Sequence, residues 1–199
     1  MRKKFNLAVK VIGLIGAVVL VEQSFHKKKH SLKCEFVLTE PDTTNIIDTT
    51  LVKVTEFAQA ISEAESSDQP YIIGGSSNHY LGKYQFGLLA MQDIYGKEKG
   101  LKLYKKYHKD ITLFTEKEQD KAFKKWVKIN QRYLKKEIKK YKNKIVHGIL
   151  ITESGLIAAA HNQGWGSVRR WLASGENTTD AFGTEIEVYL KDFKNCKLV

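Results

Sequence analysis

Two glutamates one residue apart, Glu63 and Glu65, close a stretch with the apolar periodicity of an amphipathic helix. Steps of four residues along this stretch give Phe57, Ile61 and then Glu65. Since residues four apart share one face of a helix, the spacing predicts that Glu65 faces the core. Glu63 continues the polar face, so it is predicted to be an ordinary surface charge.

A carboxyl group on a buried face has different chemistry from one in water. Loss of hydration disfavours the charged form and raises the pKa. A carboxylic acid of raised pKa can protonate the leaving oxygen of a glycosidic bond near neutral pH. The alternative is that Glu65 is the last helical residue, frayed into solvent or paired with one of the many lysines. The spacing alone leaves both readings open.

Helical patterns dominate the chain and predict a mainly α (α+β) fold. Three expected helices cover residues 51–65, 167–174 and 184–194. A fourth is long and basic and begins with a capping box at 115–118. A fifth is capped by Thr152 and ends at Gly164. The long basic helix is expected to bury one apolar side, made of Phe123, Trp126, Val127, Tyr133, Leu134, Ile138 and Tyr141. Between the first two helices, residues 71–86 carry β-type residues and a Gly-Gly turn, which predicts a small hairpin.

The N-terminus has the pattern of an export segment. A basic start, "MRKK", precedes an apolar stretch interrupted by Lys10, and "HKKKH" follows it. Residues 11–21 are too few to span a bilayer, although a start at residue 5 with a snorkelling Lys10 gives a marginal span. We therefore expect a signal peptide or membrane anchor over 1–24, a basic or polar linker over 25–48 and one folded domain over 49–195, in a periplasmic or envelope-associated protein.

Charge and cysteine content limit the possible partners. The net charge of +11 on 199 residues favours an anionic partner, for which cell wall, membrane surface and nucleic acid all qualify. No helix-turn-helix, zinc spacing or RNP-like strand is present, so nucleic acid is not expected. The two cysteines, Cys34 and Cys196, are either a disulfide or two free thiols. No metal site and no cofactor are predicted.

Four short motifs resemble, in order, those of the lysozyme-like lytic transglycosylases. "AESSDQP" resembles the Glu-Ser signature of that family, and "LGKYQFG" resembles its "GLMQ" element. "AAAHNQG" is similar to the "AYNAG" element, and "EIEVYLKDF" resembles the last helix, which carries a tyrosine. The matched positions are Glu65, Ser66, Gly82, Gln85, Ala160, Asn162, Gly164 and Tyr189. Tyr84 in place of Met and His161 in place of Tyr look closer to phage- and secretion-associated muramidase-like domains.

The resemblance implies a lysozyme-like helical domain with a small β-hairpin lobe that cleaves peptidoglycan. Its substrate would be the N-acetylmuramic acid–N-acetylglucosamine bond of the glycan strands, with Glu65 as single acid and base. The N-acetyl group of the sugar would assist, giving an anhydro product. The alternatives are a hydrolytic muramidase of the same fold and an inactive wall-binding or assembly protein. Further partners would be a membrane, through the N-terminal segment, and secretion or phage assembly components.

The resemblance also implies supporting residues around Glu65. The expected substrate-binding or orienting side chains are Ser66, Tyr84, Gln85, His161, Asn162 and Tyr189. Core packing is the alternative for Tyr189, and a structural role is the alternative for His161. If the site holds a second carboxylate, Asp68 is the nearest candidate, and a turn cap is its alternative role.

Overall fold

The computed structural model describes residues 49–75 and 77–198, with side chains from Glu56 onward. The expected export segment (1–24), the linker (25–48) and Cys34 lie outside the described residues. Cys196 is disulfide-bonded. No helix within the described part of the chain has both the length and the apolar character needed to cross a bilayer.

The described chain is mostly helical and carries two small antiparallel hairpins, which confirms the predicted mainly α class. The elements in order are α1 (Thr49–Ser66), β1 (Ile73–Gly74), β2 (Tyr80–Leu81), α2 (Leu88–Tyr95), α3 (Lys97–Lys109), the 3-10 helix η1 (Ile111–Leu113), α4 (Glu116–Tyr133), α5 (Lys135–Tyr141), β3 (Ile145–Val146), β4 (Ile149–Leu150), α6 (Glu153–Ser174) and α7 (Ile186–Asp192). The hairpin β1–β2 falls inside the predicted segment 71–86.

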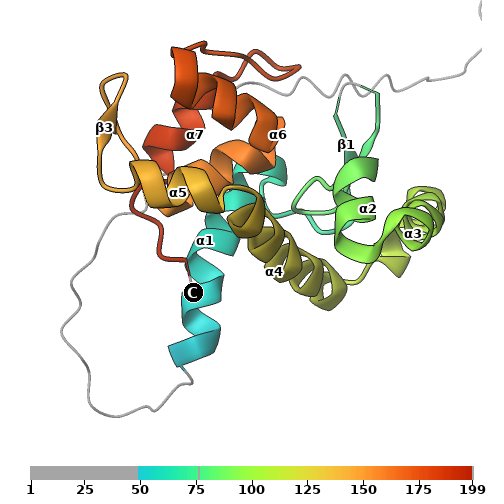
Figure 1. Ribbon diagram of the computed structural model, residues 1–199. Helices are drawn as coiled ribbons and strands as arrows, with labels where there is room; N and C mark the ends of the chain where they lie inside the picture. The colour runs from blue at the N-terminus through green and yellow to red at the C-terminus, as the bar shows by residue number, and fades with distance from the viewer. Residues whose placement is uncertain (1–48, 76, 199) are drawn as a thin grey trace, which may run out of the picture.

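Helix α4 runs through the middle of the fold (Figure 1). The β1–β2 hairpin, α2 and α3 lie to one side of it, and α5, α6 and α7 lie to the other. α4 packs against α1, α2 and α6, so it is the shared support of both sides. The end of α1, the loop after β2 and α6 are far apart in the sequence and are brought together beside it.

Helix α1 confirms the helix predicted over 51–65. Phe57, Ala58 and Ile61 are buried in the core, as the four-residue spacing requires. The helix ends at Ser66, and the next two residues adopt left-handed backbone conformations, with φ of 55° at Ser67 and 57° at Asp68. A run of two such residues cannot continue a right-handed helix, so the chain turns away immediately after Glu65 and Ser66.

The single long basic helix predicted from residue 115 onward is wrong: the structure divides it into α4 and α5 at Leu134 (φ −95°, ψ 11°). The side chain of Leu134 is fully buried at this break. Leucine is a good helix former, which is why no local signal marks the break. The capping box that opens α4 is confirmed, since Thr115 accepts from the Glu118 N–H and the Glu118 carboxylate accepts from the Thr115 N–H.

The predicted stop at Gly164 is confirmed as a break inside α6. Gly164 has φ 79° and ψ 154°, a conformation that only glycine adopts readily, and a second helical segment continues from it to Ser174. That second segment contains the helix predicted over 167–174, and α7 confirms the one predicted over 184–194. Helices α2 and α3 and the hairpin β3–β4 were not predicted.

Candidate active site

Glu65 lies at the end of α1 with its side chain only 16% exposed. Its Oε1 accepts a hydrogen bond of 2.8 Å from the hydroxyl of Tyr189, on α7. Glu63 is exposed and accepts instead from Gln59 on the polar face of the same helix. The predicted difference between the two glutamates is therefore confirmed: Glu65 faces inward and Glu63 is a surface charge.

The surroundings of Glu65 favour its protonated form. Burial raises the pKa of the Glu65 carboxyl to about 7, and the negative charge of Asp180 adds to this increase. The hydrogen bond from Tyr189 acts in the opposite direction and lowers the pKa. Since burial is the largest of these effects, Glu65 carries a proton for a substantial part of the time at neutral pH.

His161, on α6, is a neutral side chain that hydrogen-bonds both α4 and the loop after β2. The indole N–H of Trp126 donates to His161 Nδ1 (2.9 Å), so the ring proton must lie on Nε2, which donates to the Tyr84 carbonyl (2.9 Å). Burial lowers the pKa of His161 to about 4, although the hydrogen bond to Tyr84 opposes this. The 4.0 Å between His161 Nε2 and Glu65 Oε1 is therefore not an ion pair at neutral pH. Both ring nitrogens are occupied, so His161 is not available as a base.

The two residues after His161 hold the segment that precedes α7. Gln163 Nε2 donates to the carbonyls of Thr178 and Thr184, and Gln163 Oε1 accepts from the Thr178 hydroxyl at 2.6 Å. Asn162 Nδ2 donates to Asp180 Oδ2 at 3.1 Å. Three consecutive side chains of α6 thus fix both the loop after β2 and the segment that leads to Tyr189.

Ser66 is the last residue of α1 and Gln85 lies in the loop after β2. The side chains of both residues donate hydrogen bonds to backbone carbonyls. The buried Ser66 hydroxyl donates to the Lys83 carbonyl at 2.8 Å, which attaches the end of α1 to this loop. Gln85 has φ 49° and donates from Nε2 to the Gly82 carbonyl at 2.7 Å. Its side chain lies against Gly74, where an added Cβ would meet Gln85 Oε1 at 2.1 Å, so a larger residue at this position would displace the Gln85 side chain.

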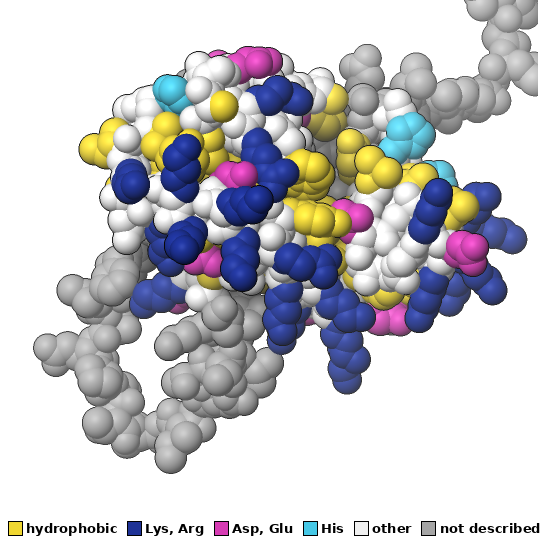
Figure 2. All heavy atoms as spheres, in the orientation of Figure 1, with side chains coloured by type: hydrophobic (Ala, Val, Ile, Leu, Met, Phe, Trp, Pro, Cys, Tyr) yellow, Lys and Arg dark blue, Asp and Glu magenta, His cyan; other side chains and the backbone are white. Residues whose placement is uncertain are grey.

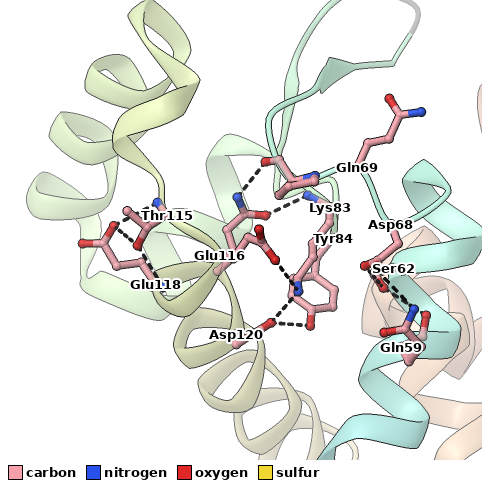
Figure 3. Close-up of polar contacts among 12 residues, drawn as sticks. Gln59, Ser62, Asp68, Gln69, Lys83, Tyr84, Thr115, Glu116, Glu118 and Asp120 are labelled. Carbon is pink, nitrogen blue, oxygen red and sulfur yellow. Dashed lines mark hydrogen bonds and ion pairs between the residues drawn. The ribbon is translucent and has the colours of Figure 1, made fainter.

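The ring of Tyr84 belongs to the core. It is 2% exposed, stacks on Phe123 with 4.2 Å between centroids, and donates from its hydroxyl to Asp120 at 2.7 Å. Lys83 Nζ lies 3.0 Å from the same carboxylate, so Asp120 joins the two residues of the loop to α4 (Figure 3). Tyr84 reaches the site through its backbone carbonyl, which accepts from His161.

Asp68 closes the end of α1. Its Oδ1 accepts from the Ser62 hydroxyl at 2.7 Å and its Oδ2 accepts from Gln59 at 3.3 Å (Figure 3). Asp68 therefore bonds two side chains of α1, and no hydrogen bond joins it to Glu65 within the described residues. The carboxylate that raises the pKa of Glu65 is Asp180, which sequence reasoning missed because a loop residue in "ENTTDAFG" has no periodicity to place it.

Gln119 is a second residue that sequence reasoning missed. It is fully buried on α4, accepts from the Lys83 N–H at 2.8 Å, and donates to the carbonyls of Pro70 and Phe114. Its amide thereby holds the loop after β2 in place. A signal was available, because Gln119 lies four residues before Phe123, on the predicted buried face.

Of the predicted site residues, the structure brings Tyr189 and His161 directly to Glu65, and it brings Asn162 to Asp180. The remaining ones, Ser66, Tyr84, Gln85 and Asp68, form hydrogen bonds to other groups. The described residues contain no group of three or more His, Cys, Asp or Glu that could hold a metal ion. Comparisons with protein-family models, curated proteins and solved structures give no match.

The raised pKa of Glu65 predicts how stability depends on pH. Because the folded state binds this proton more tightly than the unfolded state, the contribution of Glu65 to the free energy of unfolding decreases as pH rises from about 4.5 through about 7. As pH rises from about 4 to about 8, the free energy of unfolding of Glu65→Gln should therefore increase by about 3 kcal/mol relative to that of the unsubstituted protein. Urea denaturation of both proteins measures this, and the titration of His161 cancels in the difference.

The matched control is Glu63→Gln, two residues away on the exposed face. The difference in unfolding free energy between Glu63→Gln and the unsubstituted protein should change little with pH. If the corresponding difference for Glu65→Gln were equally independent of pH, the Glu65 carboxyl would not bind its proton more tightly in the folded state.

Proposed function

We propose that this protein is a peptidoglycan lytic transglycosylase that cleaves the N-acetylmuramic acid–N-acetylglucosamine bond with Glu65 as its single acid and base. The observation that carries the proposal is the isolated, largely buried Glu65 carboxyl, whose one hydrogen bond within the described residues comes from Tyr189. Such a group retains a proton near neutral pH and can transfer it to a glycosidic oxygen. The 16% exposure of its side chain leaves it open to a substrate from one side.

The reaction needs one carboxyl in two protonation states. Glu65 gives its proton to the bridging oxygen as the bond from the muramic acid C1 to that oxygen breaks and an oxocarbenium-like centre develops. The acetamido group of the sugar stabilises this centre. The Glu65 carboxylate then accepts the proton of the 6-hydroxyl, whose oxygen bonds to C1. The products are a 1,6-anhydro end and a protonated Glu65, ready for the next bond.

One feature beside Glu65 is consistent with its role as the acid. The buried His161 lies beside the Glu65 carboxyl and is neutral, and both of its ring nitrogens are occupied by Trp126 and the Tyr84 carbonyl, so it does not take the proton that catalysis requires. The order of motifs from Glu65 to Tyr189, which resembles that of lysozyme-like transglycosylases, supports the same assignment.

The surface charge suits an anionic polymer. Figure 2 shows lysine and arginine side chains spread over the face that carries α4 and α5, and the chain has a net charge of +11. Peptidoglycan carries carboxylates on its peptide stems, so long-range attraction would concentrate the enzyme on the wall. The proposal includes a lysozyme-like fold and export to the cell envelope through the N-terminal segment, with secretion or phage assembly components as further partners.

Mass spectrometry of the products tests the proposal. The full chain is incubated with purified peptidoglycan, and the soluble muropeptides are analysed, with expected products that end in 1,6-anhydro-muramic acid. A hydrolytic muramidase would give reducing ends, one water heavier. Binding to the wall without release of muropeptides would instead favour an inactive wall-binding protein and overturn the proposal.

A further inference from the structure

The β3–β4 hairpin presents an exposed apolar face. Its register places Ile145 opposite Leu150 and Val146 opposite Ile149. Because successive side chains of a strand point to opposite faces, these two pairs lie on different faces of the hairpin. Ile149 is buried and Val146 packs against the core, whereas Ile145 is 74% exposed and Leu150 is 44% exposed. Two aliphatic side chains that lie opposite each other across the strands are therefore open to solvent.

Contacts at both ends attach the hairpin to the rest of the fold. At its base, the Asn143 N–H donates to the Ile151 carbonyl at 2.8 Å, and the Ile151 N–H donates to the Lys144 carbonyl at 2.9 Å. At its tip, the ring of His147 packs edge-on against Trp171 of α6, with 5.1 Å between the ring centroids. The exposed apolar pair is thus carried by a hydrogen-bonded element. A partner that binds it need not order a free loop, which lowers the entropic cost of binding.

A group of lysines precedes the hairpin. Lys139 and Lys140 lie in the last turn of α5, and Lys142 and Lys144 lie between that helix and β3. All four are exposed. Of the four, only Lys142 pairs with a carboxylate in the part of the chain that the structure describes, that of Glu153 at 2.9 Å. Figure 2 shows apolar side chains over the hairpin beside lysine or arginine side chains over α5. We call the unpaired lysines and the apolar pair the hairpin surface, which consists of Lys139, Lys140, Lys144, Ile145 and Leu150.

We infer that the hairpin surface docks on an anionic lipid bilayer. The negative headgroups attract the three lysines, and the two aliphatic side chains enter the apolar region beneath the headgroups. The inference goes beyond the proposed function, since the hairpin surface includes none of the residues placed around Glu65. It assigns this part of the molecule a partner of its own.

Two other partners each match only half of the hairpin surface. An anionic polymer such as peptidoglycan attracts the lysines but gains little from an exposed isoleucine and leucine. A second copy of the chain covers the apolar pair but brings two sets of lysines together, and like charges across an interface repel. An anionic bilayer has negative charge at its surface and hydrocarbon below it, so its chemistry matches both the lysines and the apolar pair.

Tryptophan fluorescence tests the docking. Ile145→Trp is made in the full chain and added to vesicles of phosphatidylcholine and phosphatidylglycerol whose acyl chains carry bromine, a short-range quencher of indole emission. Docking places the new indole among the acyl chains, so its emission should be quenched, and more strongly than in brominated phosphatidylcholine alone. The unsubstituted chain gives the background from its three tryptophans. Any binding through the N-terminal segment is common to all variants, so differences between variants report the hairpin surface.

Leu89→Trp is the matched control. Leu89 is 77% exposed on α2, which lies on the other side of α4 from the hairpin (Figure 1). Its indole should stay in water and show no added quenching. Quenching of Ile145→Trp no greater than that of Leu89→Trp would overturn the inference. A blue shift of the Ile145→Trp emission with purified peptidoglycan, or with rising protein concentration alone, and no quenching by brominated lipid would also overturn it, in favour of the wall or of a second copy.

The role of charge is tested in the Ile145→Trp background. One variant combines Lys139→Gln, Lys140→Gln and Lys144→Gln. The control variant makes the same change at three exposed positions of α3, Lys102→Gln, Lys105→Gln and Lys109→Gln. Each lysine near an anionic membrane contributes about a factor of five to binding, so the first variant should dock about 10²-fold more weakly. The control should be quenched as before. Equal losses in the two variants would show attraction by overall charge alone and would overturn the hairpin surface as the docking site.

Discussion

Replacing Glu65 with glutamine should lower the rate of muropeptide release from purified peptidoglycan by about 10²- to 10⁴-fold, the usual contribution of a general acid or base. Glutamine has nearly the same shape, and its amide oxygen can still accept from Tyr189, so the site stays in place. Under the proposed mechanism, the variant lacks the proton that the bridging oxygen must receive. Initial rates of soluble muropeptide release, measured at equal protein concentration, give the comparison.

Glu63→Gln makes the same chemical change two residues away and should retain full activity. Its carboxylate is exposed and hydrogen-bonded to Gln59 rather than to the site. Thermal unfolding of both variants checks that each is folded. If Glu65→Gln released muropeptides as fast as Glu63→Gln, then Glu65 would not be the proton donor.

The four-residue spacing of α1 predicted the central feature of the site, because one helix with two core residues fixes the direction of a third. Phe57 and Ile61 are buried, and Glu65 follows them on the same face. The same spacing holds in α4, where Gln119, which sequence reasoning missed, lies four residues before Phe123 and is fully buried. In both helices a polar residue in register with core residues is buried.

Other parts of the site could not be predicted from local sequence, since long-range contacts determine them. Asp180 lies in a loop, and its role arises only when α6 brings Asn162 to it. Leu134 ends α4 although leucine favours helices, and its side chain is buried in the core. Tyr84 was expected to bind or orient the substrate, but its ring packs on Phe123. In each case the sequence identifies the residue type, and the packing partner decides its role.

His161 shows why a histidine in a site need not be a base. Both ring nitrogens are used, Nδ1 to accept from Trp126 and Nε2 to donate to the Tyr84 carbonyl. Its edge-on ring contacts with Phe86 and Phe123 complete a buried environment in which a charged imidazolium is disfavoured. The side chain therefore fixes geometry around Glu65 without competing for its proton.

His161→Ala should accordingly destabilise the fold by about 3–5 kcal/mol, since it leaves a buried indole N–H and a buried carbonyl without partners and opens a cavity among aromatic rings. Urea denaturation measures the loss. The matched control is His108→Ala, because His108 also bonds a backbone carbonyl, that of Asn78, but is exposed. That change should cost less than about 1 kcal/mol. Equal losses for the two variants would show that His161 does not hold α4, α6 and the loop after β2 together, and that Glu65 is positioned by other contacts.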